Sequence, residues 1–323
     1  MDLSLLFAGT GGAVPTAGRG LPATLVRRGA DALLFDCGEG TQRQLVRSTG
    51  LPDLQRVFLT HFHADHWLGL PGMLKSFALR DRDAPLVLHG PPGLRDLIGR
   101  MGFVIGRLPY RMTIEELEPG QAVVLDGYEV VPFVVDHRVR AYGYAIVEPD
   151  RPGRFDADRA RELGVAPGPD FGRLQRGEAV GDVTPGQVMG EARRGRKVVL
   201  SGDTAPCEMV RVAAHDADVL VHEATFLDEE AERAAETRHS TARQAAELAA
   251  EAQVGTLVLT HVSPRHPGGA IRDEARAAFP RTEVPRDLDV LEVPFPEKGR
   301  PELRRWEPPP SGSRPAAAPA AGP

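Results

Sequence analysis

The sequence predicts an α/β protein whose strands form two sheets packed face to face. Three observations indicate this class: short β-rich apolar runs recur along most of the chain, helix-like stretches follow several of them, and tight turns join many of the first strands. Tight turns favour antiparallel pairing, whereas helical connections favour parallel strands. A chain of 323 residues, 41% of them hydrophobic, is long enough to bury such a core.

The expected strands are apolar runs bounded by turn residues. In chain order they cover residues 3–9, 23–28, 31–36, 55–60, 85–90, 128–137, 142–148, 197–202, 217–224, 254–261 and 288–295. The expected helices cover residues 39–48, 65–80, 92–101 and 240–252. The repeated order of strand and helix is typical of an α/β domain.

Residues 150–196 interrupt this order, because they are rich in Pro, Gly and charged side chains. We expect an insertion that projects from the domain as an arm, with a short helix within 156–165 and turn signals in 166–177 that prevent a continuous helix. The sequence therefore divides into one domain over residues 1–307, which carries the arm, and a Pro/Ala-rich tail over residues 308–323. We expect the tail to be disordered, because it has almost no apolar side chain to bury.

Composition limits the class of protein further. No apolar run approaches the roughly 20 residues that cross a bilayer, and the first residues lack a secretion signal, so no membrane partner is expected. Cys37 and Cys207 are the only cysteines, which is too few for a disulfide framework and fits a cytoplasmic protein. A formal net charge of -6 argues against general binding of nucleic acids, and no DNA partner is expected. Residues 151–197 nevertheless hold ten Lys or Arg against seven Asp or Glu, so a polyanion contact is expected there.

The segment LTHFHADHWLGL places three histidines and one aspartate directly after a β-like run. Alternate side chains of an extended chain point the same way, so His61 and His63 can converge on one ion while Asp65 and His66 turn toward a second. Imidazole nitrogens bind zinc, and a carboxylate neutralises charge. Three other expected strands end in residues of the same kind, at His137, Asp203 and His261. If these strand ends share one edge of the sheets, their side chains suffice for two metal ions that share one carboxylate.

This pattern, HxHxDH followed by spaced His, Asp and His, resembles the metallo-β-lactamase superfamily, whose fold is an αββα sandwich with metals at one edge of its two sheets. The resemblance covers about residues 2–296. It implies two zinc ions per subunit, one held by His61, His63 and His137, the other by Asp65, His66 and His261, with Asp203 bridging both. Sites made of His and Asp also accept manganese or iron, so the metal itself stays open.

Four further segments resemble one branch of the superfamily, the ribonuclease Z family, whose members trim the 3′ end of precursor tRNA. The first, FDCGEGTQRQL, would place Asp36 behind the metal ligands, whereas Glu39 and Gln42 are expected to cap the start of a helix. The second combines VHEATF with RHSTARQAAELA. It implies that Glu223 orients His239, which assists departure of the 3′ oxygen, because a carboxylate raises the pKa of an imidazole toward working pH.

The other two segments concern the substrate. LGVAPGPDFGRLQRGE is similar to the Gly-Pro motif of the family's arm, which grips the tRNA far from the scissile bond, so Gly168, Pro169 and Gly172 are expected to contact tRNA. THVSPRH makes Arg265 a candidate contact of the scissile phosphate, because planar guanidinium donors suit phosphate oxygens.

The resemblance as a whole implies a zinc-dependent endoribonuclease that cleaves precursor tRNA after the discriminator base. Asp65 would orient the attacking hydroxide, and the products would be a tRNA 3′-hydroxyl and a 5′-phosphorylated trailer. It also implies a homodimer in which the arm of one subunit serves the site of the other. The loop VPTAGRG departs from the family pattern PxKxRN at Ala17 and Gly20, so the effect of an encoded CCA end stays open.

Three alternatives remain. The same two-metal site could serve a phosphodiesterase or an arylsulfatase-like hydrolase of small molecules. The chain could also be a non-catalytic RNA-binding or regulatory module, or a thioester or lactone hydrolase. The expected arm argues against the last, and the complete set of ligand-type residues argues against the non-catalytic module.

Overall fold

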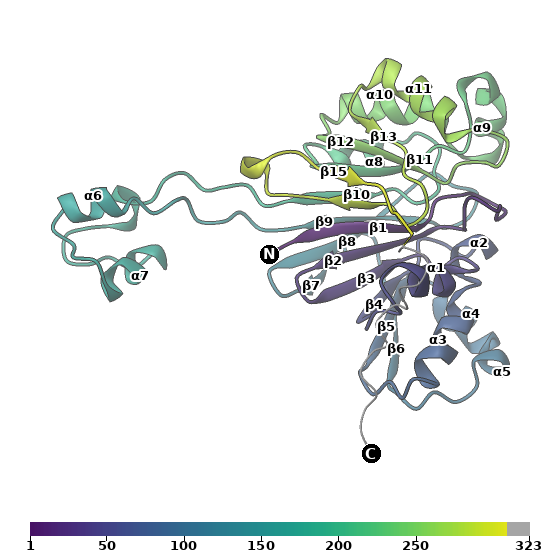
Figure 1. Ribbon diagram of the computed structural model, residues 1–323, viewed down its shortest axis with the longest axis horizontal. Coiled ribbons are helices and arrows are strands. Elements are labelled where there is room, and N and C mark those ends of the chain that lie inside the picture. Colours follow the sequence, from purple (N-terminus) through teal and green to yellow (C-terminus); the bar gives the residue numbers. More distant parts are fainter. Residues whose placement is uncertain (309–323) are drawn as a thin grey trace.

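Two β-sheets packed face to face, with helices on both outer faces, form the body of the protein (Figure 1). The computed structural model describes residues 1–308. This architecture confirms the predicted fold class. The predicted tail lies outside the described residues, apart from Pro308.

The first sheet has eight strands in the order β15-β14-β1-β2-β3-β4-β5-β6. A loop over residues 10–22 joins β1 to β2, and a short turn joins β2 to β3; both pairs are antiparallel, and β3 to β6 run parallel. The strands are β1 Leu3–Gly9, β2 Ala23–Arg28, β3 Asp31–Phe35, β4 Arg56–Phe58, β5 Leu86–Gly90, β6 Met112–Glu116, β14 Val290–Glu292 and β15 Glu302–Arg304. Helices α1 Thr41–Ser48, α2 Ala64–Trp67, α3 Leu70–Ala78, α4 Leu94–Arg100 and α5 Gly102–Ile105 lie between strands of this sheet.

The second sheet has seven strands in the order β13-β12-β11-β10-β9-β8-β7. Neighbours from β7 to β10 are antiparallel, and those from β10 to β13 are parallel. The strands are β7 Val123–Leu125, β8 Tyr128–Val134, β9 Tyr142–Val147, β10 Lys197–Leu200, β11 Val219–Glu223, β12 Thr256–Thr260 and β13 Thr282–Glu283. Helices α8 Glu208–Ala214, α9 Ala231–Thr237, α10 Ala242–Glu251 and α11 Gly268–Ala278 belong to this half.

The space between the sheets is filled by aromatic and β-branched side chains from both of them. The Phe35 and Phe58 rings of the first sheet stack with centroids 4.9 Å apart, and Tyr144 of the second sheet meets both rings edge-on. Apolar helix faces cover the outer sides through two further clusters. Burial of apolar area on both faces of each sheet stabilises the layers and leaves the strand ends free to carry polar side chains.

The predicted helix over 65–80 is wrong in one respect, because the chain forms α2 and α3 instead of one helix. The N–H of Gly69 donates to the carbonyl of Cys37 at 2.9 Å, which takes it out of the helical ladder. A Cβ at this glycine would lie 2.0 Å from the carbonyl oxygen of Gly38. The close approach of these two backbones therefore interrupts the helix at Gly69, after Trp67.

The residues between β9 and β10 project from the body as an arm (Figure 1). The arm contains α6 Ala157–Glu162 and α7 Pro169–Gln175, separated by a turn at which Gly164 and Gly168 have positive φ. A small apolar cluster of its own packs the two helices together. At the base of the arm, the Glu148 carboxylate lies 2.7 Å from Arg196 and 2.6 Å from Arg28.

Candidate metal centre

The ends of strands from both sheets bring seven ligand-type side chains to one edge of the sandwich. His61 and His63 follow β4, and His137 follows β8. Asp203 follows β10 and His261 follows β12. Asp65 and His66 lie on the single turn of α2. These are the positions that the sequence predicted, and the fold places them together because β8, β10 and β12 run in the same direction.

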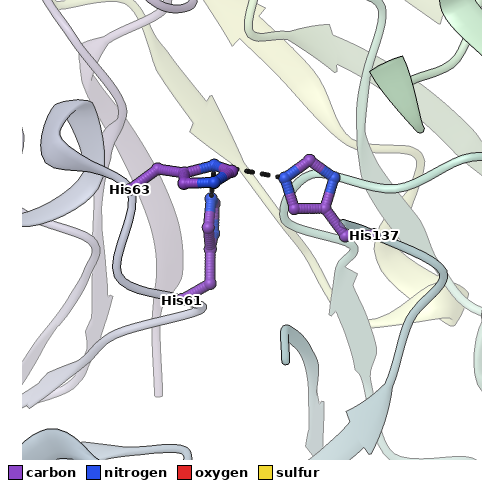
Figure 2. Close-up of side chains that lie close together, drawn as sticks. All are labelled: His61, His63 and His137. Atoms are coloured by element: carbon purple, nitrogen blue, oxygen red, sulfur yellow. Dashed lines mark hydrogen bonds between the residues drawn. The ribbon is translucent and has the colours of Figure 1, made fainter. Parts of the chain in front are cut away.

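Three imidazoles form the first group, which Figure 2 shows converging from two loops. The Nδ1 atom of His63 lies 3.0 Å from Nε2 of His61 and 3.2 Å from Nε2 of His137. Burial and the neighbouring imidazoles lower the pKa of His61, and burial also lowers the pKa of His63, so both rings favour the neutral form. Neutral imidazoles that converge in this way suit a metal ion, which accepts a lone pair from each nitrogen.

Asp203 lies between this first group and a second one made of Asp65, His66 and His261. Its Oδ2 atom is 3.3 Å from Nε2 of His66, 3.2 Å from Nε2 of His261 and 3.9 Å from Nε2 of His61. Oδ2 of Asp65 is 3.4 Å from Nε2 of His261. Burial raises the pKa of Asp203, but the charges of His261 and His66 outweigh burial and hold it well below its usual range. One carboxylate oxygen thus faces both groups.

Two buried nitrogens test whether these residues fit metal ions. Nε2 of His66 and Nε2 of His261 lie near the Asp203 carboxylate, but within residues 1–308 neither atom makes a contact with the geometry of a hydrogen bond. Leaving a buried polar atom without a partner costs roughly 1–3 kcal/mol. Coordination of a cation by both nitrogens would remove this cost, so the donor set fits a pair of divalent metal ions.

The opposite nitrogen of each of three imidazoles is held by a neighbour. Nδ1 of His66 lies 2.8 Å from the Asp36 carboxylate, which also accepts the N–H of Thr60 at 2.8 Å. Nδ1 of His261 lies 2.8 Å from the Thr225 hydroxyl, and Nδ1 of His137 lies 2.9 Å from a backbone carbonyl. Such contacts orient the ring and leave Nε2 as the ligand atom.

The loop after β1 also reaches the centre, although the sequence predicted only tight turns between the first strands. The N–H of Ala13 donates to Oδ2 of Asp65 at 3.0 Å. A Cβ on Gly12 would lie 2.4 Å from Nδ1 of His261, so only glycine allows this backbone to pass the ring. The glycine-rich segment GTGG was the available signal, because glycine often marks a close approach of backbone to a site.

His239 and Glu223 form a pair beside the metal-ligand side chains. Nδ1 of His239 lies 2.6 Å from Oε1 of Glu223 and 4.0 Å from Oδ2 of Asp203. Burial lowers the pKa of His239, but the charge and hydrogen bond of Glu223 outweigh burial and raise it to about 9. Glu223 is buried at the end of β11, and Thr204, Thr225 and other donors hold it in place. The imidazole therefore favours the protonated form at neutral pH.

The predicted substrate contacts lie in two places: Arg265 follows His261 by four residues in the loop after β12, whereas the glycines and the proline lie in the arm. The guanidinium of Arg265 lies 2.9 Å from the Glu230 carboxylate. Gly168, Pro169 and Gly172 lie at the start and within α7 in the arm. The arm leaves from the end of β9 and returns to the start of β10, whereas Asp203 follows the end of β10. The arm and the metal-ligand cluster are therefore at opposite ends of the same strands.

The predicted capping of α1 by Glu39 and Gln42 is wrong. The residue before the helix is Gly40, with φ 85, and no side chain caps the first turn. The Thr41 hydroxyl donates to the carbonyl of Gly38 at 2.7 Å, and the Gln42 amide bonds to Ser76 of α3. Glycine at the cap accommodates the sharp turn from β3 into α1.

Within residues 1–308, no helix has the length and apolar character that a membrane crossing requires.

Comparisons with known proteins identify the family. The sequence model of the Metallo-beta-lactamase superfamily matches residues 19–261. The ribonuclease Z of Myxococcus xanthus is 51% identical over 82% of this chain and 88% of its own length, and that of Haloferax volcanii is 47% identical over 91% and 96%. The crystal structure of human tRNase Z, short form, superposes with a TM-score of 0.67 at 27% identity, over 90% of this chain and 99% of its own. The chain therefore belongs to the ribonuclease Z family, metal-dependent nucleases of the metallo-β-lactamase superfamily.

Proposed function

We propose that this protein is a two-zinc endoribonuclease that removes the 3′ trailer of precursor tRNA. Cleavage after the discriminator base leaves a 3′-hydroxyl on the tRNA and a 5′-phosphate on the trailer. The observation that carries the proposal is the position of His239, which Glu223 holds at 2.6 Å beside seven ligand-type side chains. The names of the relatives, ribonuclease Z and tRNase Z, support tRNA as the substrate, and free Cys37 and Cys207 agree with action in the cytoplasm.

The donor set supports two divalent cations in each subunit. His61, His63 and His137 would hold one, and Asp65, His66 and His261 the other, with Asp203 shared between them. We favour zinc because imidazole predominates among the donors, and manganese or iron would suit the same residues. When bound, such a pair lowers the pKa of a water molecule and neutralises the charge that develops on the phosphate.

The residues of the chain itself position the two proton transfers. Oδ2 of Asp65 accepts the N–H of Ala13 at 3.0 Å, which orients this carboxylate toward the attacking water. On the opposite side of the phosphate, the His239 imidazolium would donate its Nε2 proton to the departing 3′ oxygen. Glu223 holds the Nδ1 side of that ring and stabilises its charge.

Substrate binding is assigned to Arg265 and the arm. The Arg265 side chain is 46% exposed, so a phosphate can reach it from solvent. A phosphate oxygen could therefore replace the Glu230 carboxylate as the partner of the guanidinium. The Gly168–Pro169 pair starts α7 with φ 155 at Gly168, a conformation that favours glycine. We assign Gly168, Pro169 and Gly172 to contacts with the tRNA backbone, far from the scissile bond.

A homodimer would bring an arm and a metal centre to the same tRNA. Within one chain they lie at opposite ends of the strands (Figure 1), so the arm of a second copy is better placed to grip the substrate. Leu79, directly after α3, and Phe103 and Val104 on the neighbouring α5 are 81%, 100% and 57% exposed. Burial of these side chains against a second copy would supply the apolar contact that a dimer requires.

Cleavage of a precursor tRNA with a 3′ trailer tests the proposal, with and without an encoded CCA end and beside an Asp65→Ala variant. We expect cleavage after the discriminator that the variant lacks. Deletion of residues 155–185 should abolish tRNA cleavage and spare hydrolysis of a small activated phosphodiester. If the metal-loaded protein left both precursors intact but hydrolysed the small phosphodiester, it would be a small-molecule phosphodiesterase.

A further inference from the structure

Helix α9 ends at a residue whose backbone conformation is unusual for its type. Arg238, directly after the helix, has φ 58 and ψ 48, the left-handed region that favours glycine. The N–H of His239 donates to the carbonyl of Ala234 at 2.9 Å, and the N–H of Arg238 donates to that of Ala235 at 3.3 Å. This pattern closes many helices, usually with glycine at the left-handed position. The backbone therefore favours glycine at a position where the sequence has arginine.

The contacts of Arg238 show what its side chain and carbonyl do. Its Nη1 atom lies 2.8 Å from each carboxylate oxygen of Asp136, the residue before His137. Its carbonyl oxygen lies 2.9 Å from Nδ1 of His137. Because a carbonyl only accepts, Nδ1 is the donor, and Nε2, which lies 3.2 Å from Nδ1 of His63, is the nitrogen available to bind a metal.

A third contact reinforces the same connection. The Nε atom of Arg138 donates to the carbonyl of Glu236, in the last turn of α9, at 3.2 Å. Helix ends leave such carbonyls without helical partners, so the loop supplies donors that α9 lacks. The loop residues 136–138 are thus bound to the end of α9 through three successive side chains.

The other neighbour of Arg238 is His239. The ring centroids of His137 and His239 lie 5.0 Å apart, and both side chains reach the Asp203 carboxylate group. Arg238 therefore stands between a ligand-type imidazole, which it contacts through space, and the imidazole held by Glu223, which follows it in the chain.

We propose that Arg238 is a positioning residue that sets the distance between His137 and His239 by binding Asp136 and Nδ1 of His137. This inference rests on the proposed function, in which His137 binds metal and His239 donates a proton. Glycine at position 238 would keep the turn but release the loop of His137 from the guanidinium. Arginine is present because this contact holds two parts of the centre together, in spite of the backbone preference.

The Arg238→Gly variant tests the proposal, because glycine suits the observed φ and the fold should survive. We expect Zn²⁺ affinity, measured by competition with a chromophoric chelator, to fall about three- to tenfold. The expected loss is small because the ion pair between Arg238 and Asp136 is partly exposed. With precursor tRNA, kcat should fall by a similar factor while KM stays constant. Asp136→Asn should have the same effects, and the double variant should be no worse than either single one, because both remove one interaction.

Gln253→Gly is the matched control. Gln253 has φ 56 after α10, its N–H donates to the carbonyl of Ala250 at 3.1 Å, and the N–H of Val254 donates to that of Ala249 at 3.1 Å. This helix end has the same hydrogen bonds as that of α9, so Gln253→Gly should leave Zn²⁺ affinity and kcat unchanged.

Three results would overturn the role of Arg238: wild-type Zn²⁺ affinity in Arg238→Gly, an equal loss in Gln253→Gly, or additive losses from Arg238→Gly and Asp136→Asn. If wild-type protein failed to cleave precursor tRNA, the proposed function would fall. The Zn²⁺ comparison would still decide whether Arg238 positions the centre.

Discussion

Replacement of Glu223 by glutamine tests how His239 is charged. Burial lowers the pKa of His239, and the charge of Glu223 raises it to about 9, against an ordinary value of 6.5. At pH 7.5 a group with a pKa of 9 is about 97% protonated, whereas a group with a pKa of 6.5 is about 9% protonated. Burial without the carboxylate would lower the pKa of the variant further. We therefore expect kcat at pH 7.5 to fall at least about tenfold in Glu223→Gln.

The dependence of kcat on pH shows in which direction Glu223→Gln shifts the pKa of His239. Activity that requires protonated His239 is lost as pH rises through its pKa in the working site, so the basic limb of kcat should move to lower pH in Glu223→Gln. Bound divalent cations would lower the pKa of His239 in both proteins. The measured quantity is therefore the difference between the two profiles, recorded with a precursor tRNA in single-turnover reactions so that product release does not hide the chemical step.

Stability is the necessary control, because Glu223 also holds backbone groups. Its Oε1 accepts the N–H of Thr204 at 2.9 Å, and its Oε2 accepts the N–H of Ser240 at 3.2 Å. Either orientation of a glutamine amide turns NH2 toward one of these donors, which costs roughly 1–3 kcal/mol. Thermal unfolding should show this loss while the fold is kept. An unchanged basic limb in a folded variant would refute the assignment of Glu223 and His239.

Three further results are expected. Asp203→Asn should lower the metal content measured by mass spectrometry below two ions per chain, because Asp203 faces both groups; two retained ions would contradict the shared ligand. Gly12→Ala should weaken Zn²⁺ binding by about tenfold or more, since its Cβ would lie 2.4 Å from His261, whereas Gly18→Ala, with open space around its Cβ, should not. Glu148, whose two arginine partners outweigh burial, has a pKa of about 2, lowered from 4.5. Its contribution to stability, roughly 3 kcal/mol, is complete above pH 4.5 and lost as pH falls toward 2. Urea unfolding of Glu148→Gln should therefore approach wild type at low pH, and a constant difference would contradict this.

The local patterns of the sequence predicted the elements that bury the most apolar surface. The runs at 3–9 and 23–28 coincide with β1 and β2, because strands that are covered on both faces are buried almost throughout and appear as continuous apolar runs. The strand β6, Met112–Glu116, was missed, since it lies at a sheet edge and none of its residues is fully buried. Its formation depends on pairing with β5, a partner that local sequence does not reveal.

Part of the candidate site could also be predicted from local sequence, and part of it could not. His61, His63, Asp65 and His66 lie within six residues, so their convergence follows from local backbone geometry and could be predicted. The ends of β8, β10 and β12 meet these four residues only because of the order and direction of the strands. The resemblance to a known fold predicted this arrangement, whereas the spacing of residues alone could not.

The ligand types, the arm and the family resemblance could therefore be predicted from the sequence, because each depends on a short stretch of chain. Three contacts became visible only in the folded chain: Ala13 binds Asp65, Gly12 makes room for His261, and Arg238 connects Asp136 to His239. These contacts join residues far apart in the chain. The energies of these contacts change when a distance changes by a few tenths of an ångström. The packing of the two sheets fixes these distances, and local preferences of the chain do not.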